Sequence, residues 1–142
     1  MYNSDIDPSN MYKNIFDFSN HIKEAFEFFN HNSSLNSNLK NEINSIMILG
    51  MGGSAITGLL MKDLLKNNIN IPIHVNQGYD IPKWVNNKTL IIACSYSGNT
   101  EETLNAAEKC HQENAKIIGF TTGGKLFKLV EKYKWEYVLM PK

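Results

Sequence analysis

Short apolar runs alternate with segments of helical periodicity after residue 44. Five runs of mostly apolar residues predict strands, at residues 46–49, 71–75, 89–94, 116–120 and 136–140. Three segments with apolar residues three or four positions apart predict helices, at residues 55–66, 101–112 and 126–133. A short turn or helix around residues 82–85 joins the second strand to the third. The order of these elements predicts repeated β-α-β units.

The third predicted strand is apolar on both faces, because residues 90–93 are Leu, Ile, Ile and Ala. Strands of this kind belong to parallel sheets that helices cover on both sides. We therefore predict an α/β fold, a three-layer α-β-α sandwich with a five-stranded parallel sheet. Ligands of such sheets bind at the carboxyl ends of the strands, near the point where the strand order reverses.

The first 44 residues follow a different pattern. Apolar residues between Met11 and Phe29 recur at three- and four-residue steps, which predicts one amphipathic helix. The Asn- and Ser-rich residues 31–38 predict a connector, because their side chains compete for backbone hydrogen bonds. We expect residues 1–44 to form a helix and connector, and residues 45–142 to form the sheet domain.

Composition excludes several classes of function. The chain has 14 basic and 14 acidic residues and a formal net charge of zero, which leaves no basic surface for nucleic acid. It has no long uninterrupted apolar run and no signal peptide at residues 1–8, so we expect a cytoplasmic protein without a membrane partner. Cys94 and Cys110 lack metal or redox spacing and are expected to be inert thiols. The histidines are scattered, so no metal or cofactor is expected.

A glycine-rich segment, Gly-Met-Gly-Gly-Ser-Ala at residues 50–55, follows the first predicted strand. Glycines allow a sharp turn and a close approach to a ligand, while Ser54 is suited to cap the next helix and to face an anion. A plain turn without a ligand is the alternative. The segment also fits the dinucleotide pattern G-x-G-x-x-A, but the acid expected after the second strand is missing until Asp80.

A hydroxyl-rich segment, residues 95–103, follows the third predicted strand. Ser95, Ser97 and Thr100 precede the helix at residues 101–112, and Gly98 allows the chain to bend. Hydroxyls, exposed backbone N–H groups and the positive end of a helix dipole together favour a phosphate dianion. A capping box formed by Asn99 and Glu102 is the alternative for part of this segment.

Three further features have ordinary explanations. Thr-Thr-Gly-Gly-Lys at residues 121–125 follows the fourth strand and could close a pocket or form a plain turn, and we assign no ligand contact to Lys125. Glu101 and Glu102 are explained by the helix dipole rather than by catalysis. Trp84 and Trp135 lie beside apolar residues and are expected in the core.

Residues 50–56, 95–104 and 122–126 resemble, in their order and spacing, the SIS (sugar isomerase) domain of bifunctional phosphoglucose/phosphomannose isomerases, in its N-terminal portion. The resemblance implies a flavodoxin-like sheet whose loops bind the phosphate of glucose 6-phosphate, mannose 6-phosphate or fructose 6-phosphate. It also implies a homodimer. Position by position, the implied phosphate-binding residues are Gly53, Ser54, Ser95, Ser97 and Thr100.

The sequence departs from this family in its length and at one position. Family members usually carry a second SIS domain, and a Pro-x-Gly-x-x-Pro-Arg segment follows their first sheet. This chain ends at Pro141 and Lys142, and Leu59 replaces an Asp that is common after the glycine loop. We expect an N-terminal half without catalytic residues that is inactive in isolation. The alternatives are a non-catalytic phosphosugar-sensing module and a dinucleotide-binding domain.

Overall fold

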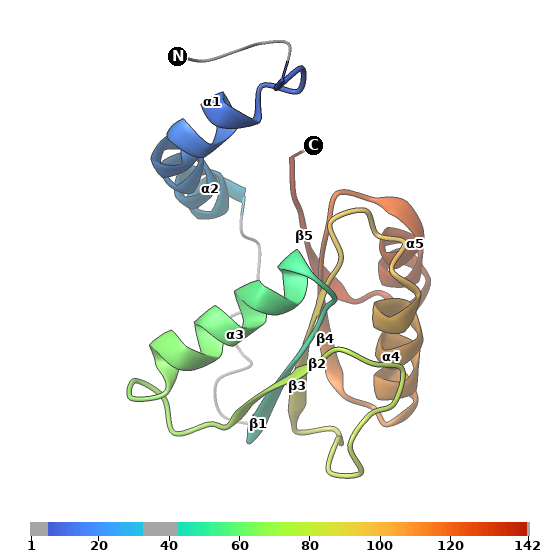
Figure 1. Ribbon diagram of the computed structural model, residues 1–142. Helices are drawn as coiled ribbons and strands as arrows, with labels where there is room; N and C mark the ends of the chain where they lie inside the picture. Colours follow the sequence, from blue (N-terminus) through green and yellow to red (C-terminus); the bar gives the residue numbers. More distant parts are fainter. Residues whose placement is uncertain (1–5, 33–42, 142) are drawn as a thin grey trace. The chain divides into compact units, whose positions relative to one another are not determined.

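The computed structural model describes residues 6–32 and 43–141 (Figure 1). The chain separates into two compact units, Met1–Ser34 and Leu35–Lys142. The second unit holds a sheet and the helices that pack on it, and it contains every segment to which we assigned chemistry.

The sheet has five parallel strands in the order β2-β1-β3-β4-β5. Their bounds are β1 Ser45–Leu49, β2 Ile73–Asn76, β3 Thr89–Cys94, β4 Lys116–Thr121 and β5 Glu136–Leu139. Strand β1 lies between β2 and β3, so Leu49 is in register with both Asn76 and Ala93. The strand order reverses at the β1/β3 boundary, where ligands of this topology bind.

Three helices cover the sheet: α3 Gly53–Leu65, α4 Glu101–Gln112 and α5 Gly124–Tyr133. Helix α3 lies on one side of the sheet, and α4 and α5 lie on the other (Figure 1). Right-handed crossovers explain this arrangement. The chain moves from β1 to β2 in one direction along the sheet and from β3 to β4 in the opposite direction, so the connecting helices α3 and α4 lie on opposite faces. The predicted three-layer sandwich is confirmed.

The core lies between the sheet and helices α4 and α5. Met47 and Ile91 are fully buried, and α4 presents the small side chains of Ala106 and Ala107 to them in one cluster. Trp135 joins this cluster as expected, but the prediction for Trp84 is wrong, because its side chain is 42% exposed. Trp84 lies in the turn that joins β2 to β3, where the neighbouring Val85 is buried instead.

Some predicted boundaries shift for local reasons. Strand β2 begins at Ile73 and not at residue 71. Pro72 has no N–H to give to the ladder, although its carbonyl accepts a hydrogen bond of 2.9 Å from the Ile46 N–H. Helices α3 and α5 each begin two residues earlier than predicted, at Gly53 and Gly124.

The N-terminal unit contains two helices, α1 Met11–Phe16 and α2 Phe18–Asn32, and not the single helix predicted. The break falls at Asp17, whose N–H ends α1 by bonding to Lys13 and whose carbonyl begins α2 by accepting from Asn20 and His21. The apolar stripe of both helices is exposed within this unit. The predicted connector beyond Asn32 lies outside the described residues until residue 43.

The helices of the described part are all too short or too polar to cross a membrane. Across the same residues, no group of three or more His, Cys, Asp or Glu side chains is arranged to hold a metal ion.

Candidate functional site

A cavity of about 580 Å³ opens at the carboxyl edge of the sheet. All five predicted site residues line it: Gly53 and Ser54 from the start of α3, and Ser95, Ser97 and Thr100 from the segment between β3 and α4. The fold therefore brings together two segments that lie about forty residues apart in the sequence. The remaining lining residues are Met51, Thr57, Cys94, Tyr96, Phe120 and Met140.

The first wall of the cavity is the turn between β1 and α3. The Gly50 N–H donates to the Asn76 carbonyl at 3.2 Å, which fixes the turn to the end of β2. The N-cap of α3 is Gly52, and no side chain caps this helix. The prediction that Ser54 caps α3 is therefore wrong. Ser54 is the second residue of the helix and lines the cavity, and its N–H donates to the Met51 carbonyl at 3.1 Å.

The second wall is the segment between β3 and α4, and its hydroxyls are already arranged by hydrogen bonds. Ser95 Oγ and Thr100 Oγ1 lie 2.9 Å apart, so one hydroxyl donates to the other and a single proton of the pair stays available to a ligand. Ser97 Oγ accepts a 3.3 Å hydrogen bond from the Asn99 N–H. The Ser97 hydroxyl therefore keeps its own proton for donation into the cavity.

The capping-box interpretation of Asn99 and Glu102 is wrong. Helix α4 has Thr100 as its N-cap and no side-chain cap. The side-chain oxygen of Asn99 instead accepts a hydrogen bond of 3.2 Å from the Lys125 N–H, in a different loop. No local pattern indicates this contact, because the two residues are 26 positions apart.

The loop after β4 packs directly against the second wall. The Tyr96 carbonyl accepts from both the N–H and the hydroxyl of Thr122, at 3.1 and 2.8 Å. Gly98 has a φ of 69°, and a Cβ atom on it would collide with the Gly123 carbonyl. Only glycine allows this turn and this approach at the same position. The loop at residues 121–125, considered above as a possible pocket closure, thus packs against the segment between β3 and α4 and supports this wall of the cavity.

The cavity lining is uncharged and combines hydroxyl-bearing residues with apolar ones such as Met51, Phe120 and Met140. The described lining contains no Lys or Arg, and both α3 and α4 begin at it, since Gly53 and the N-cap Thr100 are lining residues. Two helix N-termini supply N–H groups and partial positive charge without a cationic side chain. Burial raises the pKa of the Cys94 thiol to about 11, so this lining residue stays protonated at neutral pH. The arrangement suits an anion and offers no thiolate at neutral pH.

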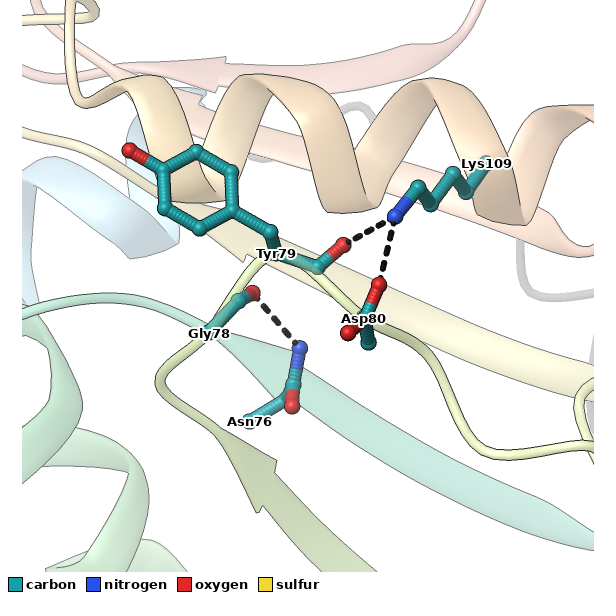
Figure 2. Close-up of polar contacts among 5 residues, drawn as sticks. All are labelled: Asn76, Gly78, Tyr79, Asp80 and Lys109. Carbon is teal, nitrogen blue, oxygen red and sulfur yellow. Dashed lines mark hydrogen bonds and ion pairs between the residues drawn. The ribbon is translucent and has the colours of Figure 1, made fainter.

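The loop after β2 is fastened to α4, as Figure 2 shows. Lys109 Nζ donates to Asp80 Oδ1 at 2.8 Å and to the Tyr79 carbonyl at 2.9 Å. The hydrogen bond and charge of Lys109 lower the pKa of Asp80. Asp80 is the first acid after β2, so the carboxylate that a dinucleotide site would need is committed to Lys109.

The ring of Tyr79 lies along α4 (Figure 2). The pKa of Tyr79 is raised by partial desolvation of this exposed side chain, by the charges of Glu102 and Glu101, and by a hydrogen bond to Glu102. Sequence reasoning missed this contact between the β2 loop and the first turn of α4. It also missed Thr57, which lines the cavity one helical turn after Ser54 and could have been found from that spacing.

A family model for the SIS domain matches residues 40–125, which is more than half of the chain. The chain belongs to the SIS domain family. The resemblance seen in the sequence is confirmed, because the chain is 45% identical over 109 residues to the bifunctional phosphoglucose/phosphomannose isomerase of Caldicellulosiruptor bescii. That match covers 76% of this chain and 32% of the relative.

Two further proteins are similar to the chain, one in sequence and one in structure. The chain is 34% identical over 97 residues to the D-glucosamine-6-phosphate 4-epimerase of Sulfolobus acidocaldarius, a match that covers 68% of this chain and 30% of the relative. The structure of tagatose-6-phosphate ketose/aldose isomerase from Escherichia coli aligns with a TM-score of 0.62 and 21% identity over 89% of this chain and 36% of that one, which supports the fold. This SIS chain spans about a third of the length of the curated relatives it matches.

Substitution of Gly98 tests whether the close approach of the two loops supports the cavity. We expect Gly98→Ala to lower the free energy of unfolding by about 2 kcal/mol or more, because alanine is strained at this φ and its Cβ meets the Gly123 carbonyl. Urea denaturation measures the change. Gly78→Ala is the matched control, since a Cβ there has no atom within 4 Å, and it should change stability by less than about 1 kcal/mol. Equal effects of the two substitutions would contradict the packing described.

Proposed function

We propose that the cavity binds the phosphate of a hexose 6-phosphate, and that this SIS domain serves an isomerase that interconverts glucose 6-phosphate or mannose 6-phosphate with fructose 6-phosphate. The observation that carries the proposal is the convergence of two hydroxyl-bearing segments and two helix starts on one cavity. Backbone N–H groups at helix N-termini and hydroxyl donors are a recurrent phosphate site. The names of the curated bifunctional relatives support the choice of substrate.

Each of the five residues has a separate part in this proposal. Ser97 donates its free proton to a phosphate oxygen, and the Ser95 and Thr100 pair donates the single proton that their mutual hydrogen bond leaves. Gly53 supplies a backbone N–H from the first turn of α3, and Ser54 supplies its hydroxyl, because the Ser54 N–H already donates to the Met51 carbonyl at 3.1 Å. A dianion gains from all of these donors together, because charge-assisted hydrogen bonds are stronger than neutral ones.

The cavity anchors the substrate and leaves the proton transfer to other groups. Aldose-ketose isomerisation needs a base that moves a proton between C2 and C1. The described residues that line the cavity include no carboxylate, imidazole or amine, and the pKa of Cys94 at about 11 keeps its thiol protonated. We therefore propose that the base comes from outside these 142 residues, which agrees with the partial coverage of the relatives.

Calorimetric titration with fructose 6-phosphate tests the phosphate site. We expect saturable binding by the wild-type chain and about tenfold weaker binding by Ser97→Ala, because the variant loses one hydrogen bond to a charged group. Thr103→Val is the control: it removes a buried hydroxyl from α4 that has no hydrogen-bond partner and does not line the cavity. Absence of binding by a folded wild-type chain would count against the proposal.

The isolated chain should bind the substrate without converting it. A coupled assay for glucose 6-phosphate formation from fructose 6-phosphate, at saturating substrate, is expected to show no turnover above the buffer rate. Substrate turnover that survives repurification of the chain would show that the base lies within these residues after all.

A phosphosugar-sensing module without catalysis is the second candidate, and the lack of a base among the described lining residues favours it equally. Both candidates give binding without turnover in this chain. Turnover by the complete product of the reading frame that encodes the chain would decide for the isomerase.

We also propose that the protein forms a homodimer. The outer surface of α3 supports this, because Ile56, Leu60 and Leu64 are 58%, 59% and 70% exposed and recur every four residues as one apolar stripe.

Light scattering on a concentration series tests the dimer. We expect the wild-type chain to have twice the mass of one copy, and Leu60→Glu to dissociate it, because the variant places a charge in an apolar contact. Asn67→Glu adds the same charge just beyond the end of α3 and should leave the dimer intact. A wild-type chain that stays monomeric up to high concentration would rule out this dimer.

A further inference from the structure

Asn99 connects two loops of the site without lining the cavity. It lies between Ser97 and the start of α4 and is exposed. Its side-chain nitrogen donates to the Ser97 carbonyl at 3.0 Å, its side-chain oxygen accepts from the Lys125 N–H at 3.2 Å, and its own N–H donates to Ser97 Oγ at 3.3 Å. Asn99 therefore uses three of its polar atoms on neighbours in two separate loops.

The contact with Lys125 supplies a helix cap from another part of the chain. Helix α5 begins at Gly124 with Gly123 as its N-cap, and glycine has no side chain to accept the first-turn N–H groups. The side-chain oxygen of Asn99 accepts from Lys125, and the Gly98 carbonyl accepts from Leu126 at 2.8 Å. The first turn of α5 is thus completed by the loop that carries Ser97.

The contacts with Ser97 determine what that residue can offer a ligand. Asn99 occupies the Ser97 carbonyl through its side chain and one lone pair of Ser97 Oγ through its N–H. The Ser97 hydroxyl keeps its proton and a second lone pair, and of these the proton is the group that can donate to an anion in the cavity. An aliphatic residue at position 99 would keep the N–H contact but release the carbonyl and the Lys125 N–H.

We infer that Asn99 is a positioning residue: it fixes Ser97 as a donor to the phosphate and couples the occupied cavity to the first turn of α5. This inference rests on the proposed phosphate site. Asn99 then contributes to ligand affinity although its side chain lies outside the cavity. Ligand binding also changes the first turn of α5, a helix that contributes no lining residue.

The test combines calorimetry with amide NMR on the 142-residue chain, using fructose 6-phosphate as the ligand. We expect Asn99→Ala to weaken binding about fivefold to tenfold, the effect of losing a hydrogen bond that orients a donor to a charged group. In the wild type, saturation with the ligand should shift the Lys125 amide resonance. In Asn99→Ala that shift should disappear, and the Lys125 amide should exchange faster with solvent even without ligand. Asn105→Ala, an exposed asparagine farther along α4, should change none of these quantities.

The Leu126 amide is an internal control, because its hydrogen bond goes to a backbone carbonyl that the substitution leaves in place. Loss of protection at both Lys125 and Leu126 would mean general unfolding of the loop and would overturn the specific role of Asn99. Unchanged affinity in Asn99→Ala beside a wild type that binds would overturn this inference alone. A folded wild type that binds no fructose 6-phosphate would overturn the phosphate site and this inference together.

Discussion

Strand β1 pairs in parallel with β2 on one side and β3 on the other, and this pairing determines where the rest of the chain can meet. Leu49, at the end of β1, is in register with Asn76 and with Ala93, so three strands finish at one edge. Right-handed crossovers then place α3 and α4 on opposite faces of the sheet. The turns that lead into the two helices face each other across the β1/β3 boundary, and the cavity forms between them.

The parts of the fold that local patterns specify could be predicted from the sequence. Strand β3 and helix α4 have the predicted bounds, because the apolar run at residues 89–94 and the helical periodicity at residues 101–112 need no information from elsewhere. The same order of elements also predicted that the five site residues lie close together, because parallel strands end at a common edge of the sheet. Their role as phosphate ligands stays a prediction.

The predictions that were wrong concern Asn99, Ser54 and Trp84, where the local sequence did not determine the arrangement. Asn99 has the composition of a helix cap, but its side chain is used by Lys125, a contact that only the folded loops create. Ser54 was expected at an N-cap that the flexible backbone of Gly52 occupies instead. Trp84 follows apolar neighbours, yet the direction of the turn buries Val85. In each case local chemistry allowed two arrangements, and tertiary packing chose between them.

The neutral lining of the cavity has a consequence for how a ligand arrives. Hydroxyls and amide dipoles act over a few ångströms, whereas a cluster of lysines or arginines would project its attraction well into solvent. The described lining holds no such cluster, and the chain as a whole has a formal net charge of zero. The proposed phosphate ligand is therefore attracted only once it reaches the cavity, and its association rate is that of ordinary diffusive encounter. Ionic strength should alter that rate little, because the described lining holds no cluster of charges for salt to screen.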